Sequence, residues 1–135
     1  MTNEIDVVKT FYDSLKKGDV PTAFSILDPD VEWSVPESLP YGGVYHGPDA
    51  VRQYRGQIEA HLAEGFRLTP EEFLSEGERV VVLGRLRGQA KETGIAIDVP
   101  FAHVWTVRNG KVVARRYVMD TATLVRAFNG EQVAA

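Results

Sequence analysis

Apolar residues in the first part of the chain recur every three or four positions, which is the spacing of one face of an α-helix. The pattern predicts a helix over residues 3–17. Its apolar face would comprise Ile5, Val8, Phe11, Tyr12 and Leu15. Asn3 or Thr2 can cap the start of this helix, and Gly18 can end it.

Two further helices are predicted before the periodicity changes. A short one follows Asp19, which caps it, and residues 28–30 end it. A longer one starts at Gly47-Pro48-Asp49, with proline in its first turn, and Gly65 ends it. Between these helices, residues 36–47 are rich in Pro, Gly and Tyr, and they are expected to form a loop over the mouth of a pocket.

Alternation of apolar and polar residues indicates strands in most of the remaining chain. The predicted strands cover residues 31–35, 66–75, 79–88, 97–108 and 111–119. Pro70 interrupts the second of them, which is typical of an edge strand or a bulge. Asn109-Gly110 predicts a tight hairpin between the last two. A final helix is expected over residues 121–128, and the tail after Asn129 is expected to fray.

The order of these elements predicts the fold class. Helix, helix, strand, helix and then a meander of long strands is typical of an α+β domain. A single domain over residues 1–135 is expected, because this length is close to the commonest domain size. The order requires no βαβ crossover and the chain has no glycine-rich phosphate motif, so no cofactor is expected.

Composition and charge narrow the function classes. The chain has no cysteine, which excludes a disulfide framework and a cysteine nucleophile. Its net charge is −4 and it has no basic block, so nucleic acid is not an expected partner. Its apolar runs are too short to span a membrane, and residues 1–4 lack a signal-peptide pattern, so a cytoplasmic location is expected. His46, His61 and His103 lack metal-ligand spacing, so no metal is expected.

Four segments carry a resemblance to a known family. They are Lys17-Gly18-Asp19, Asp30-Val31-Glu32-Trp33, Tyr45-His46-Gly47-Pro48-Asp49-Ala50-Val51 and residues 101–111, FAHVWTVRNGK. With them the chain resembles the SnoaL-like group of the nuclear-transport-factor-2-like superfamily. The resemblance implies a cone-shaped fold, in which a curved antiparallel sheet wraps around N-terminal helices and encloses an apolar pocket. It does not imply one function, because the fold hosts isomerases, cyclases, hydrolases and binding domains.

Ketosteroid isomerase chemistry is not expected from this resemblance. The positions of the family's tyrosine, its base and its neutral aspartate fall on Phe11, Trp33 and Ala102, so all three groups are missing. Tyr12 lies one residue from the tyrosine position, but on a helix that is a rotation of about 100°.

Two other branches of the family match only in part. Epoxide hydrolases need an arginine flanked by two aspartates, whereas Arg85 is followed by Arg87 where an acid is required. Polyketide cyclases use an aspartate on the final strands, aided by a histidine, and that aspartate position falls on Tyr117, which shares a strand face with Met119. A buried tyrosine is a weak acid or a hydrogen-bond donor, and a poor base because its ordinary pKa is near 10.

Two titratable candidates also have structural interpretations. Asp120 directly precedes the last predicted helix, where a carboxylate caps exposed N–H groups. His103 has a pKa suited to acid–base work. One face of its strand carries Phe101, His103 and Trp105, and the other carries Ala102, Val104 and Thr106. The match at Ala102 points the small residues into the pocket, so His103 is expected on the outer face, in a dimer interface.

Two hypotheses for function follow. The first is a SnoaL-like protein that binds an apolar, carbonyl-bearing small molecule, or an isomerase, cyclase or hydrolase acting on such a ligand by acid–base chemistry. Its candidate catalytic residues are Tyr117, His103 and Asp120. Its candidate ligand-binding residues are Phe11, Tyr12, Trp33, Tyr41, Tyr54, Ala102, Val104 and Met119. The alternative is a non-catalytic ligand-binding or adapter domain that forms a homodimer through the outer face of the sheet.

Overall fold

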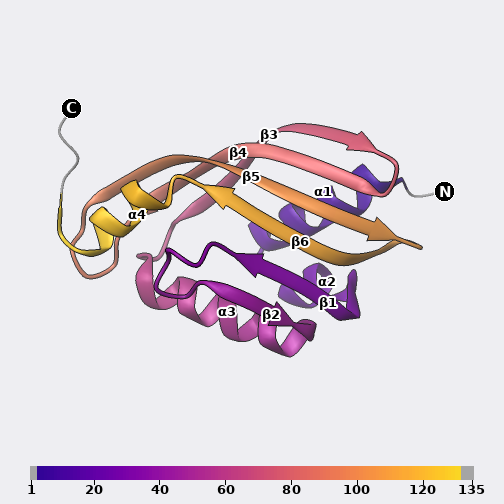
Figure 1. The fold of residues 1–135 in the computed structure, drawn as a ribbon, viewed down its shortest axis with the longest axis horizontal. Helices are drawn as coiled ribbons and strands as arrows, with labels where there is room; N and C mark the ends of the chain where they lie inside the picture. Colours follow the sequence, from indigo (N-terminus) through magenta and orange to yellow (C-terminus); the bar gives the residue numbers. More distant parts are fainter. Residues whose placement is uncertain (1–2, 132–135) are drawn as a thin grey trace.

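The computed structural model describes residues 3–131 of the chain, and its helices and strands follow one another as Figure 1 shows. In chain order they are α1 (Glu4–Lys16), α2 (Val20–Ser25), β1 (Leu27–Val35), β2 (Gly43–His46), α3 (Gly47–His61), β3 (Arg67–Glu76), β4 (Arg79–Gln89), β5 (Ala96–Arg108), β6 (Lys111–Met119) and α4 (Thr121–Phe128). The predicted helix caps are confirmed, since the side chains of Asn3, Asp19 and Asp120 each accept a backbone N–H of the first turn.

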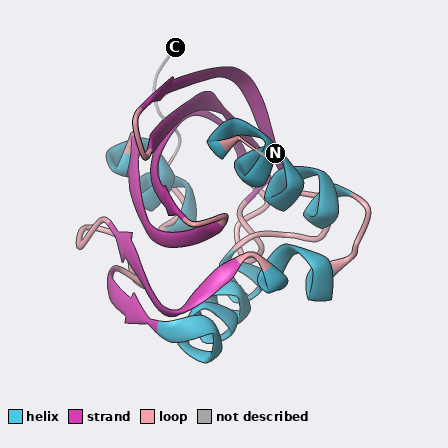
Figure 2. Ribbon diagram, turned by 90° about the vertical axis from the view of Figure 1, so that its right-hand side faces the viewer, coloured by secondary structure: helices cyan, strands magenta, loops and turns pink. Residues whose placement is uncertain are grey.

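The strands form one sheet in the order β2-β1-β6-β5-β4-β3. Neighbouring strands run antiparallel, except for β1 and β6, which run parallel. The sheet is strongly curved and does not close on itself (Figure 2). The predicted α+β class with a curved sheet is therefore confirmed, while the parallel β1–β6 pair corrects the expectation of a purely antiparallel sheet. The pair forms because the meander returns its last strand to the edge of β1.

The predicted hairpin and edge strand are confirmed. Asn109 and Gly110 both have positive φ, 54° and 76°, as a tight turn between β5 and β6 requires. β3 lies at one edge of the sheet, and its register with β4 shifts between Pro70 and Glu72. The shift marks a bulge at the proline, which has no N–H to give to a ladder.

A close approach of backbone to side chain occurs at Gly84, opposite this bulge. A Cβ atom at Gly84 would overlap the carbonyl oxygen of Thr69 and lie 2.8 Å from Cζ of Phe101. Only glycine leaves room for β3 and the aromatic ring of β5 to meet β4 this closely.

Four boundaries differ from the predicted ones. Residues 43–46, predicted as part of a loop, form β2, because they pair with the end of β1. Residues 28–30, predicted to end a helix, lie within β1. α3 ends at His61, before Gly65. Of the tail predicted to fray, Asn129–Glu131 donate backbone N–H groups to the last turn of α4, and residues 132–135 lie outside the described residues.

The helices cover the sheet in a way that creates one enclosed side. α1 packs against β3, β4, β5 and β6 on the concave side, while α3 packs against β1 and β2 and α4 against β5. The centre of this side is aromatic. Ring centroids of Phe11, Trp33 and Trp105 lie between 5.2 and 5.6 Å from one another. Large apolar rings packed at such distances stabilise the core beyond their buried area.

Candidate functional site

The face that β5 turns to the interior is the reverse of the predicted one. Phe101, His103 and Trp105 are buried, whereas Ala102 and Val104 are only partly buried. The orientation predicted for Ala102 and Val104 is therefore wrong, and they lie on the outer face of the sheet. The large side chains point inward, where Phe11 and Tyr12 of α1 pack against Trp105 and His103.

A buried hydrogen-bond chain links α1 to β5. The hydroxyl of Tyr12 lies 2.5 Å from Nδ1 of His103, and Nε1 of Trp105 donates to the Tyr12 oxygen at 3.1 Å. Tyr12 thus faces the interior together with its neighbour Phe11, and the helical rotation that argued against Tyr12 does not remove it from the site. The other ring nitrogen of His103, Nε2, is buried and has no hydrogen-bond partner among residues 3–131.

The protonation of this chain follows from its environment. Burial lowers the pKa of His103 well below its usual value of 6.5, and the charge of Arg115 lowers it further. Burial also raises the pKa of Tyr12 far above that of a free tyrosine. Both side chains are therefore neutral near pH 7. We assign the Tyr12 proton to Nδ1 of His103, because this nitrogen is the one acceptor that the described residues place at the hydroxyl, and the imidazole then carries its proton on Nε2.

β6 completes the site with a residue that the sequence reasoning missed. Arg115, Tyr117 and Met119 lie directly opposite Trp105, His103 and Phe101 in the register of β5 and β6. Arg115 is only 3% exposed, and its Nε and Nη2 atoms are buried without a hydrogen-bond partner among the described residues. One signal could have found it, because Arg115 precedes the correctly paired Tyr117 and Met119 by an even number of residues and so shares their strand face.

Tyr117 packs between the two polar groups of the site. Its ring centroid lies 4.4 Å from that of His103, in an edge-on arrangement, and 5.0 Å from the guanidinium carbon of Arg115. Burial raises the pKa of Tyr117 well above 10. The hydroxyl therefore stays protonated and can act as a donor but not as a base.

The other aromatic candidates are buried on the same side. Trp33 lies beside Arg115 on the neighbouring strand, and its ring centroid is 3.8 Å from the guanidinium carbon. Its Nε1 is a further buried group with no partner among residues 3–131. The ring centroids of Tyr54 in α3 and Tyr41 in the loop between β1 and β2 lie 5.9 Å apart. The Tyr54 ring centroid also lies 5.9 Å from the guanidinium carbon of Arg115. These residues extend the aromatic lining from Arg115 toward the loop 36–42.

Asp120 has the role of a helix cap. It is exposed, and its two carboxylate oxygens accept from the backbone N–H and the hydroxyl of Thr123 at 3.1 and 2.6 Å. These hydrogen bonds lower its pKa below the usual value. The contacts recorded for Asp120 do not join it to Tyr12, His103 or Arg115.

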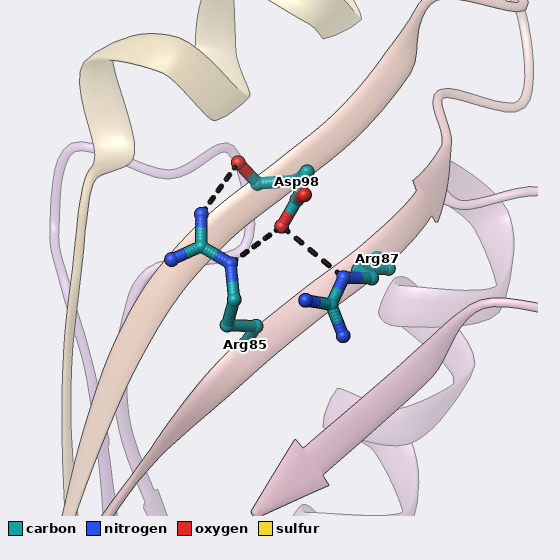
Figure 3. A network of polar contacts seen from close by, with 3 residues as sticks. All are labelled: Arg85, Arg87 and Asp98. Atoms are coloured by element: carbon teal, nitrogen blue, oxygen red, sulfur yellow. Dashed lines mark hydrogen bonds and ion pairs between the residues drawn. The ribbon is translucent and has the colours of Figure 1, made fainter. Parts of the chain in front are cut away.

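Arg85 and Arg87 lie on the outer face of the sheet, where they share one carboxylate (Figure 3). Arg85 Nε donates to Asp98 at 2.7 Å, and Arg87 Nε lies 3.5 Å from the same oxygen. The hydrogen bond from Arg85 lowers the pKa of Asp98. This arrangement of two arginines around one exposed aspartate is the opposite of an arginine between two buried aspartates, so the epoxide hydrolase constellation is absent from this network.

Two hollows of the surface lie away from the hydrogen-bond chain. One, of about 410 Å³, is lined by Asp28, Asp30, Arg108, Asn109, Lys111 and Val113 near the β5–β6 turn. The other, of about 40 Å³, is lined by Ala60, His61, Ala90, Glu92 and Phe128 beside α3 and α4. Among residues 3–131 no cluster of three or more His, Asp or Glu side chains could hold a metal ion, and no helix there is long and apolar enough to cross a membrane.

Comparison with known proteins places the chain in a family. The SnoaL-like domain family matches residues 8–115, which carry most of the helices and strands described above. The chain belongs to the SnoaL-like domain family. The resemblance stated from sequence motifs is thereby confirmed.

Solved structures and relatives agree with this assignment. A nuclear-transport-factor-2-like protein of unknown function from Burkholderia pseudomallei is 37% identical, with a TM-score of 0.87 over 95% of this chain and 98% of the other. The protein TerC, crystallised with polyporic acid, is 29% identical, with a TM-score of 0.86 over 93% and 98% of the two chains. An uncharacterized protein of Mycobacterium tuberculosis is 29% identical over 81% of this chain and 82% of its own.

Proposed function

We propose that this SnoaL-like domain binds an apolar, carbonyl-bearing small molecule on the concave side of its sheet. The observation that carries the proposal is the buried Tyr12–His103 hydrogen bond within a mostly apolar interior. Buried polar groups are costly unless they are paired, and Nε2 of His103 has no partner among residues 3–131, which favours a role in holding a polar atom of a ligand. In this proposal, Nε2–H of His103 donates a hydrogen bond to the carbonyl oxygen of the ligand.

The protonation states favour binding and polarisation of a carbonyl over proton abstraction. No Asp or Glu among residues 3–131 is buried, so the described interior offers no carboxylate base. The buried Tyr12 and Tyr117 keep their protons. Moving a proton fully from His103 to the ligand would leave a charge on His103 or Tyr12 in apolar surroundings. A donated hydrogen bond carries no such penalty.

Entry of a ligand requires a covering segment to move, because aromatic side chains fill the centre of the concave side. We infer that the loop 36–42 and α4 form the entrance. Tyr41 of this loop packs against Phe128 of α4, with ring centroids 6.2 Å apart, and Ser38 donates to the hydroxyl of Thr121 at 2.8 Å. The hollow of about 40 Å³ lies at this same end, beside Phe128.

The similarity to TerC supports a ligand of this class. That protein was crystallised with polyporic acid, and its fold covers 93% of this chain. Polyporic acid is therefore the first ligand to try, together with 2-acetonaphthone, which presents a ketone on a flat apolar body.

The test is the rise in melting temperature of the full chain with each compound, for the wild type and for a Tyr12→Phe/His103→Leu double variant. We expect the wild type to melt several degrees higher at a ligand concentration of about 100 times Kd, where binding adds roughly 2.7 kcal/mol. The double variant removes both partners of the hydrogen bond and should lose most of the shift with 2-acetonaphthone. Equal shifts in wild type and double variant would refute the role of His103.

The control variant is His46→Leu, which removes an exposed histidine from the start of α3. It should keep the full ligand-induced shift. If this variant also lost the shift, the effect could not be assigned to the interior site.

We further propose that the outer face of the sheet forms a homodimer. Leu83, Ala102 and Val118 lie side by side on β4, β5 and β6, and Leu83 and Val118 are 36% and 52% exposed. A row of exposed apolar side chains across three strands is typical of an interface. Dimerisation and ligand binding use opposite faces and are compatible.

A further inference from the structure

The guanidinium of Arg115 has one complete edge without partners. Its Nε and Nη2 atoms are both buried, and neither has a hydrogen-bond partner among residues 3–131. These two nitrogens lie on the same side of the planar group, where their N–H bonds point outward in parallel. Such an edge matches the two oxygens of a carboxylate in a bidentate pair.

No protein carboxylate satisfies this charge within the described chain. The ion pairs recorded among residues 3–131 involve five other arginines and leave Arg115 out. An arginine cannot lose its proton in a protein, so burial does not neutralise it. A buried charge without a counterion is strongly unfavourable.

Aromatic rings offset only part of this cost. The guanidinium carbon lies 3.8 Å from the ring centroid of Trp33 and 5.0 Å from that of Tyr117, with Trp105 at 5.7 Å and Tyr54 at 5.9 Å. Ring faces attract the cation by their quadrupoles. They do not accept the two in-plane N–H bonds of the free edge, which need oxygen acceptors.

The other unpartnered groups nearby are donors as well. Trp33 Nε1 can only donate, and His103 donates through Nε2 because Nδ1 is engaged with Tyr12. Trp33, His103 and Arg115 lie on the inner face of the neighbouring strands β1, β5 and β6. In the register of these strands Arg115 pairs with Trp33 on one side and with Trp105 on the other. The interior therefore presents N–H donors from three strands and no buried carboxylate from the described residues.

We propose that the ligand of this domain carries a carboxylate, which binds the Nε–Nη2 edge of Arg115 while its apolar body packs among the surrounding aromatic rings. The proposal rests on the proposed function, because it places the ligand in the same interior site. It adds the chemical class of that ligand, an aromatic or otherwise apolar carboxylic acid in its ionised form.

The experiment compares naphthalene-2-carboxylate with naphthalene-2-carboxamide by isothermal titration calorimetry on the full chain. The two probes share shape and apolar area and differ in charge. We expect the wild type to bind the carboxylate at least about tenfold more tightly, because hydrogen bonds between charged groups are the stronger kind. Equal affinities, or tighter binding of the amide, would overturn the proposal.

Two arginine variants locate the effect. Arg115→Met keeps a long unbranched side chain but removes the charge and the N–H donors, and it should reduce the preference for the carboxylate to less than about twofold. Arg116→Met removes the neighbouring arginine, which is exposed on the outer face, and should keep the preference. A preference that survives in Arg115→Met, or disappears in Arg116→Met, would assign the charge effect to another place.

Failure of this inference can be separated from failure of the proposed function. If 2-acetonaphthone binds through His103 while carboxylate and amide bind equally, the interior site stands and the anionic ligand is refuted. If the carboxylate is preferred through Arg115 but the Tyr12→Phe/His103→Leu variant binds the ketone normally, only the role of His103 fails. Absence of binding by all three naphthalene probes contradicts both proposals. The wild-type comparison needs no variant to fold, so the anion test holds even if Arg115→Met is unstable.

Discussion

At the scale of single residues, the neutral state of His103 links the site to the stability of the fold. The imidazole is completely buried, with its Nδ1 engaged by Tyr12. Its pKa is lowered first by burial and then by the charge of Arg115. In the unfolded chain the same histidine titrates at its usual value of 6.5. Below that pH the unfolded state binds a proton that the folded state does not.

The free energy of unfolding should therefore fall as the pH drops through 6.5 toward the lower folded-state pKa. Above pH 6.5 His103 is neutral in both the folded and the unfolded chain, and the stability that depends on its neutral form is fully present. One proton corresponds to a slope of about 1.4 kcal/mol per pH unit. Urea denaturation of wild type and of Tyr12→Phe/His103→Leu, at about pH 7.5 and about pH 5.5, measures it. The double variant should lose this slope, and His46→Leu should keep it. If the stability of wild type and double variant depended on pH in the same way, His103 would titrate alike in the folded and the unfolded chain, which would contradict the prediction.

At the scale of elements, the close packing of β3 and of Phe101 from β5 against β4 depends on Gly84. Gly84→Ala should destabilise the fold by about 1–3 kcal/mol, because the new methyl group would overlap the Thr69 carbonyl and press on Phe101. Gly56→Ala is the matched control. Gly56 is exposed within α3, and apart from the neighbouring backbone of that helix nothing lies within 4 Å of an added Cβ, so alanine there should stabilise by up to roughly 1 kcal/mol. Thermal or urea unfolding of the two variants measures both effects, and equal effects of the same sign would contradict the steric explanation.

The elements themselves were largely predictable, because local chemistry determines them. The caps at Asn3, Asp19 and Asp120 and the turn at Asn109 act through their own backbone neighbours, and the sequence displays them directly. β2 was not predictable in this way. Residues 43–46 are strand only because the end of β1 pairs with them, and that partner lies beyond the local pattern.

Face assignment failed for a different physical reason. Both faces of β5 carry apolar residues, so the period of two identifies two faces but not which one α1 covers. The structure settles this through a contact between residues 91 positions apart, Tyr12 and His103. Arg115 was missed for a related reason. Charge alone suggests exposure for both residues of the Arg115-Arg116 pair, and the local sequence has no sign that one of them is buried. The parity of Arg115 with Tyr117 was the only available signal.

At the scale of the whole molecule, the outer face of the sheet has the properties of an interface that the inner face lacks. Leu83 and Val118 flank Ala102 across three central strands, and charged Arg85, Arg87 and Asp98 lie on the same face of β4 and β5. An apolar centre with a charged margin is the usual anatomy of a protein interface. In a two-fold dimer each such residue faces the same patch of the other copy, so a single added charge is introduced into the interface twice.

Leu83→Glu and Val118→Glu should therefore each convert a dimer of the 15.0 kDa chain to a monomer, because two buried like charges would oppose association. Light scattering of the wild type and variants at micromolar concentration measures the mass directly. Val44→Glu is the matched control, since Val44 is 53% exposed but lies on β2 at the other end of the sheet, and this variant should stay dimeric. A monomeric wild type, or dimers that persist in both Glu variants, would refute the interface. Retention of ligand binding in the monomeric variants would further show that the concave site functions without the second copy, as its position on the opposite face predicts.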